Sequence, residues 1–174
     1  MKYAFLNKNF RNLSFEKKTI FLSHALTLIF CFFPWFSSTP IYGEDFFYNA
    51  FKGPGFLIGF FIFIISLVIV MLFVDRLLEK QKVKLPFPES FLYGVAGIQQ
   101  IILLILAWSV LASTGLEQEG GTIRFGIFLV FIAQISGLVA TFLFFQIEAQ
   151  KTARGFFKHP NEKDKSETLI AKKQ

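Results

Sequence analysis

Four long apolar segments recur along the chain, separated by shorter stretches rich in charged residues, glycine or proline. They cover residues 19–36, 56–74, 91–113 and 123–147. A hydrocarbon core of ~30 Å needs about 20 helical residues, and each segment is within a few residues of that length. A helix of a soluble bundle would carry a polar stripe, whereas segment 56–74 offers only Gly59 and Ser66. The pattern therefore predicts four transmembrane helices.

The composition of the 174-residue chain agrees with this prediction. Hydrophobic residues make up 53% of the chain and charged residues 17%, and there are 26 phenylalanines. A water-soluble core cannot bury so much apolar surface, whereas a bilayer accepts it on every side. We expect an all-α, integral membrane four-helix bundle with antiparallel, up-down spans. Residues 1–155 would form the transmembrane domain, and residues 156–174 a disordered, charged cytoplasmic tail.

The basic residues are distributed unevenly between the two sets of span ends. Of the 18 lysines and arginines, all but Lys52 and Arg124 lie in the N-terminal segment, in the loop between the second and third spans, or after the fourth span. The positive-inside rule then places both termini in the cytoplasm, and we expect the cell (plasma) membrane. The net charge of +6 indicates contact between the basic flanks and anionic lipid headgroups, not nucleic acid binding.

Polar side chains near the middle of a span are costly, which makes them the first candidates for a role. Gln100 and Gln134 would each lie ~15 Å deep, close to the midplane of the bilayer. Because the third and fourth spans are antiparallel and joined by a short loop, we expect these two amides to meet. Hydrogen bonding between helices is the favoured role, and a polar permeation path is the alternative. The polar candidates are Gln99, Gln100, Gln134 and Ser136, of which Gln100 is preferred to Gln99 because it shares a face with Ala96 and Ala107.

Small residues form a stripe on the fourth span. Their separations of seven, four and three residues match the spacing of a helix interface, where small side chains let another helix approach closely. The stripe consists of Gly126, Ala133, Gly137 and Ala140.

His24 is the one histidine inside a span. It would lie near the cytoplasmic end of the first span, where it could donate to a backbone carbonyl or bind Glu148 at a similar level on the fourth. A proton-relay role for this pair is the alternative, because histidine titrates near neutral pH.

The first external loop is long and aromatic, with the sequence FFPWFSSTPIYGEDFFYNAF over residues 32–51. Aromatic belts are typical of the membrane interface, so an interfacial anchor is the simpler interpretation. An external docking surface built around Trp35, Glu44 and Asp45 is the alternative.

Several classes of protein are excluded by what the sequence lacks. Cys31 is the only cysteine, so the external loops contain no disulfide, and two histidines cannot supply the paired ligands of a transmembrane haem. The sequence has no zinc-ligand spacing, no P-loop and no hydrolase motif. We therefore expect no metal, no cofactor and no catalytic residue.

These observations favour a non-enzymatic accessory or structural subunit that interacts with other membrane proteins or with itself. The first alternative is a transporter or channel subunit with a polar path near Gln100 and Gln134. The second is a lipid-modifying membrane enzyme with a site on the cytoplasmic side.

Overall fold

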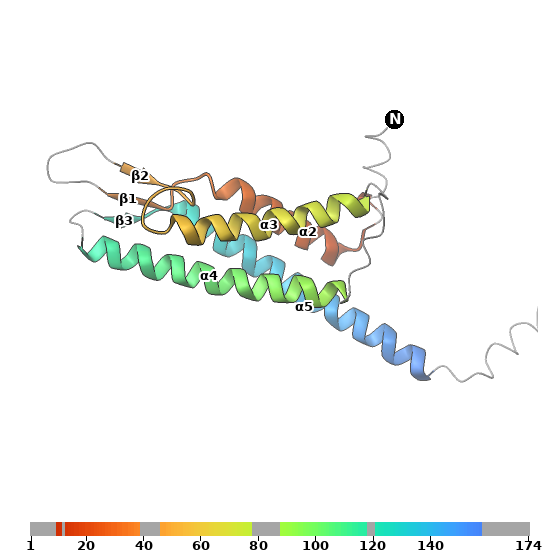
Figure 1. The fold of residues 1–174 in the computed structure, drawn as a ribbon. Coiled ribbons are helices and arrows are strands. Elements are labelled where there is room, and N and C mark those ends of the chain that lie inside the picture. Colours follow the sequence, from red (N-terminus) through yellow and green to blue (C-terminus); the bar gives the residue numbers. More distant parts are fainter. Residues whose placement is uncertain (1–9, 12, 39–45, 78–87, 118–120, 158–174) are drawn as a thin grey trace, which may run out of the picture.

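The structure is a computed structural model that describes residues 10–11, 13–38, 46–77, 88–117 and 121–157. The described part is mainly helical, with a small sheet at one end of the helices (Figure 1). The elements are α2 (Phe15–Phe30), β1 (Phe36–Ser38), β2 (Phe46–Tyr48), α3 (Phe56–Leu77), α4 (Glu89–Glu117), β3 (Thr122–Ile123) and α5 (Phe125–Phe157).

The four helices form a closed, antiparallel ring. α2 packs on α3 and α5, and α4 packs on the same two helices, so each helix has two neighbours. α5 extends past the other three at the end opposite the sheet (Figure 1). It continues to Phe157, so the first two residues of the predicted tail are helical, and residues 158–174 of the tail lie outside the described residues.

Among the described residues, three helices are long and apolar enough to cross a membrane. These are Phe56–Asp75 in α3, Glu89–Gly115 in α4 and Phe125–Ala153 in α5. α2 has 16 residues, a length of about 24 Å against ~30 Å of hydrocarbon. The structure thus supports three of the four predicted spans by length and composition, and the first helix is shorter than the predicted segment 19–36.

α2 ends at Phe30 because the backbone that follows it pairs with other elements. The amide of Ala50 donates to the carbonyl oxygen of Cys31 at 3.1 Å, and the amide of Trp35 donates to Tyr48 at 2.8 Å. Pro34 has no amide hydrogen and could not continue the helical ladder. The helix therefore ends at Phe30, six residues before the end of the predicted segment at residue 36.

The sheet was not predicted, because the aromatic loop 32–51 was interpreted as an interfacial anchor. β1 is the central strand and pairs antiparallel with both β2 and β3. It therefore joins the loop between α2 and α3 to the segment just before α5, and a purely helical fold class is incomplete.

The core consists of two apolar clusters, one at each end of the bundle. The sheet-side cluster packs below the strands, and the opposite cluster packs where α2 and α4 begin. The sheet-side cluster contains Cys31, Trp35, Phe36, Ala50, Ile62, Leu104, Ala107, Leu111, Ile127 and Val130. The opposite cluster contains Ile20, Ile69, Phe73, Tyr93, Ala96, Ala140 and Phe144.

Candidate functional site: a buried polar layer

A layer of polar side chains separates the two apolar clusters, and every helix contributes to it. On α4, for example, Gln100 lies one turn from Ala96 of the opposite cluster and one turn from Leu104 of the sheet-side cluster. The layer is buried, since no member is more than 2% exposed. We define the polar layer as Ser23, His24 and Thr27 of α2, Ser66 of α3, Gln100 of α4 and Gln134 of α5.

Gln134 connects α5 to α2. Its Nε2 donates to Thr27 Oγ1 at 2.7 Å. The Thr27 hydroxyl in turn donates to the carbonyl oxygen of Ser23 at 2.9 Å. Thr27 is therefore both acceptor and donor, and this half of the layer is a continuous chain of hydrogen bonds.

Gln100 connects α4 to α3 rather than to α5. Its Nε2 donates to Ser66 Oγ at 2.7 Å and to the carbonyl oxygen of Ile62 at 3.1 Å. The expected contact between Gln100 and Gln134 is absent. The reason is rotational: in the ring, Gln100 faces α3 and Gln134 faces α2, so each amide bonds to a different neighbour.

Two buried atoms of the layer have no hydrogen-bond partner, Nδ1 of His24 and Oε1 of Gln100. His24 bonds neither to Glu148 nor, through Nδ1, to a backbone carbonyl, although one of the two was expected. Burying a polar atom without a partner costs about 1–3 kcal/mol, so these atoms are the least satisfied part of the core.

The other two polar candidates lie on the outside of the bundle. Gln99 is exposed, one position away from the buried Gln100. Ser136 is also exposed, and its hydroxyl donates to the carbonyl oxygen of Ala133 on its own helix at 2.7 Å. Neither residue joins two helices.

The small-residue stripe lies under α2 and the segment that follows it. A Cβ atom on Gly137 would lie 2.3 Å from Ser23 Oγ, and one on Gly126 would lie 2.5 Å from the carbonyl oxygen of Pro34. Ala133 and Ala140 are buried on the same helix. The helix that approaches this stripe is α2 of the same chain, so the stripe is not available to another protein.

Trp35 is likewise unavailable for docking. It is 2% exposed, and its Nε1 donates to the carbonyl oxygen of Phe30 at 3.1 Å. Glu44 and Asp45, the other residues of the expected docking surface, lie outside the described residues.

A different surface is exposed at this end, and sequence reasoning missed its polar residues. Ser37 Oγ accepts a hydrogen bond from Arg124 Nε at 2.7 Å and lies 2.8 Å from Thr122 Oγ1. The Arg124 guanidinium lies 5.8 Å from the ring centre of Phe47, and Phe46 and Phe47 are exposed. We call strands β1, β2 and β3 together with Arg124 the sheet platform. Ser37 is 85 positions from Thr122 and 87 from Arg124, so no local sequence signal could have joined them.

In the part of the chain that the structure describes, no group of three or more His, Cys, Asp or Glu side chains could hold a metal ion. The charged residues near the end opposite the sheet do form one ion pair, between Lys17 Nζ and Glu89 Oε2 at 3.5 Å.

No family model, curated protein or solved structure matches this chain.

Proposed function

We propose that this protein is a four-span membrane protein of the cell membrane, with both termini in the cytoplasm, that serves as a non-enzymatic accessory subunit for other membrane proteins. α2 would cross the membrane in addition to α3, α4 and α5. Its Leu22 and Ile29 are exposed to the outside of the ring, and the segment between Phe30 and β1 would extend it towards the interface. A slightly short span is accommodated by local thinning of the bilayer at a modest cost.

The observation that carries the accessory role is the sheet platform. β2 is an edge strand, paired only with β1, and it carries the exposed rings of Phe46 and Phe47. An exposed strand edge is a template for pairing with another chain, and aromatic residues with arginine are enriched in protein interfaces. The platform is therefore the surface that fits a partner's external loop or strand.

The interior of the bundle supports the same proposal. Gln100 and Gln134 are 0% and 1% exposed, and their amide groups bond to neighbouring helices. Such bonds hold neighbouring helices of a bundle together.

The test is photocrosslinking in native membranes with a photoreactive amino acid at Phe46. The control carries the same amino acid at Val68, an exposed position on α3. We expect a reproducible adduct with another membrane protein from position 46 and none from position 68. Adducts with a second copy of this chain alone, or the same adducts from both positions, would contradict the accessory role.

A polar path through the layer is the second candidate, because Nδ1 of His24 and Oε1 of Gln100 are buried without partners. Groups of this kind could bind a passing polar species. Purified protein in liposomes would then conduct protons or small ions, and Gln100→Leu together with Gln134→Leu would abolish the flux while the protein still assembles. No flux from correctly folded protein would exclude this candidate.

A further inference from the structure

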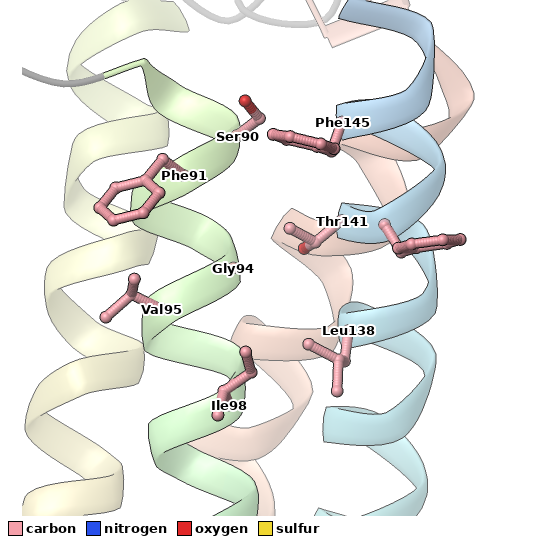
Figure 2. Close-up of a pocket in the computed structure, with 9 residues that line it drawn as sticks. Ser90, Phe91, Gly94, Val95, Ile98, Leu138, Thr141 and Phe145 are labelled. Carbon is pink, nitrogen blue, oxygen red and sulfur yellow. The ribbon is translucent and has the colours of Figure 1, made fainter. Parts of the chain in front are cut away.

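The outer surface of the bundle has a groove between α4 and α5, with a volume of about 230 Å³. Figure 2 shows side chains of the two helices on either side of it. Phe91 and Val95 form the wall on α4, Phe142 and Phe145 form the wall on α5, and all four are exposed. The groove therefore opens sideways, away from the core of the bundle.

The floor of the groove is apolar even where its residue types are not. Thr141 directs its hydroxyl to the carbonyl oxygen of Gly137 at 2.9 Å. Its methyl carbon Cγ2 then faces Gly94, at 3.9 Å from where a Cβ atom would stand. Because Gly94 has no side chain, nothing beyond the helix backbone fills the groove at this point.

The groove is short. Towards the sheet it is closed where Leu138 packs on Gly97, with Leu138 Cδ1 3.1 Å from the position of a Gly97 Cβ atom. Towards the opposite end it reaches Ser90, in the first turn of α4. From Ser90 to Gly97 the helix rises about 10 Å, which is less than the ~15 Å depth of one leaflet.

These dimensions fit a single hydrocarbon chain better than a second transmembrane helix. A helix with its side chains is about 10–12 Å wide and packs along most of its length. A groove that ends at Leu138 gives such a helix contact over about two turns. An acyl chain is narrower, and the groove lies within the depth of a single leaflet.

The charge at the Ser90 end indicates which lipid. Sixteen of the 18 lysines and arginines of the sequence flank the span ends on this side. Lys17 lies there, 3.5 Å from Glu89. Basic residues near the membrane surface favour anionic headgroups by about 1 kcal/mol each.

We propose that the α4–α5 groove binds one acyl chain of an anionic glycerophospholipid, with the headgroup beside Ser90. The proposal rests on the membrane placement of the proposed function and is independent of docking at the sheet platform.

The experiment uses tryptophan quenching by phospholipids brominated on the acyl chain. Phe142→Trp places the reporter in the groove, and Val68→Trp places a matched reporter on the exposed face of α3. The native Trp35 and Trp108 are the common background. Each full-length variant is reconstituted with brominated phosphatidylglycerol or brominated phosphatidylcholine.

For Phe142→Trp we expect phosphatidylglycerol to quench at about 5-fold lower mole fraction than phosphatidylcholine, which corresponds to about 1 kcal/mol. For Val68→Trp we expect equal quenching by the two lipids. In the Phe142→Trp background, filling the groove with Gly94→Leu should remove the preference. Val95→Phe, at an exposed position that tolerates substitution, fills the groove independently if the glycine variant does not fold.

Three outcomes would overturn the proposal. Equal quenching of Phe142→Trp by both lipids would mean that the groove holds no particular lipid. Absence of quenching there, with normal quenching of Val68→Trp, would mean that a protein helix covers the groove. Absence of quenching in both variants would refute the membrane placement itself, and with it the proposed function.

Discussion

Gln134 of α5 and Thr27 of α2 are 107 residues apart in the sequence and are joined by a hydrogen bond of 2.7 Å from Nε2 to Oγ1. This bond holds the first and last described helices together at the level between the two apolar clusters. On the other side of the ring, Gln100 does the same for α4 and α3. The two amides thus fix two separate helix pairs.

The two glutamines should differ in their contribution to stability. Gln134→Leu removes the bond to Thr27, and we expect it to destabilise the bundle by about 0.6–1.7 kcal/mol. Gln100→Leu also removes the unpartnered Oε1, so it should be neutral or stabilising. The measurement is unfolding in mixed detergent micelles, with the exposed Gln99→Leu as the control. A larger loss for Gln100→Leu than for Gln134→Leu would contradict the assignment of Oε1 as unsatisfied.

Gly137 should be intolerant of any side chain. In Gly137→Ala the new methyl group would meet Ser23 at Oγ and at Cβ, which lies 2.9 Å away, and overpacking of this kind costs about 1–3 kcal/mol. Adding Ser23→Gly removes both atoms and should restore most of the loss. Gly94→Ala is the control, because its nearest contact would be an ordinary 3.9 Å. Thermal melting of these three variants and of the unchanged protein checks the prediction, and equal losses in Gly94→Ala and Gly137→Ala would contradict it.

The proposed topology predicts how engineered thiols react in intact cells. Lys52→Cys, at an exposed position on the sheet side, should react with a membrane-impermeant maleimide added outside. Lys151→Cys, exposed near the other end of α5, should react only after permeabilisation. Cys31 is 0% exposed and should stay unlabelled in both cases until the protein is denatured. Labelling of Lys151→Cys from outside would reverse the orientation.

Ser37 should control the order of the sheet platform. Ser37→Ala removes the acceptor for Arg124 and the partner of Thr122, at about 1 kcal/mol for each bond. We expect several-fold faster hydrogen exchange at the Arg124 amide, which donates to Trp35 at 2.8 Å. Ser113→Ala, whose hydroxyl bonds only within its own helix, is the control. Unchanged exchange in Ser37→Ala would show that the strand pairing alone orders the platform.

The sequence predicted the helices well, because their signal is long and local. α3 begins at the predicted residue 56 and ends three residues after the predicted segment, and α4 begins two residues before its predicted segment and ends four after it. Gln100 is buried, whereas Gln99 is exposed. The bonding partners of the amides could not be predicted. Helix length and depth say nothing about rotation or about which helices are neighbours in the ring.

The sheet was missed for a related reason. Phenylalanines such as Phe36, Phe46 and Phe47 occur both in strands and in interfacial aromatic belts, so the residue type alone does not tell the two apart. Only the pairing of β1 with β2 and β3 distinguishes the two, and the pairing with β3 depends on tertiary structure. The bonds from Ala50 to Cys31 and from Trp35 to Tyr48 explain why α2 is shorter than its apolar segment.

The position of β1 in the centre of the sheet has a consequence for biosynthesis. Thr122 emerges from the ribosome 85 residues after Ser37, which is about 4–17 s at ordinary elongation rates. During that interval β1 can pair with β2 but not with β3. α2, β1, β2 and α3 are therefore made before α4 and β3 can join them. Because β3 precedes α5 in the chain, the sheet can close before α5 has been synthesised, whereas a ribosome stalled before β3 would leave β1 with β2 alone.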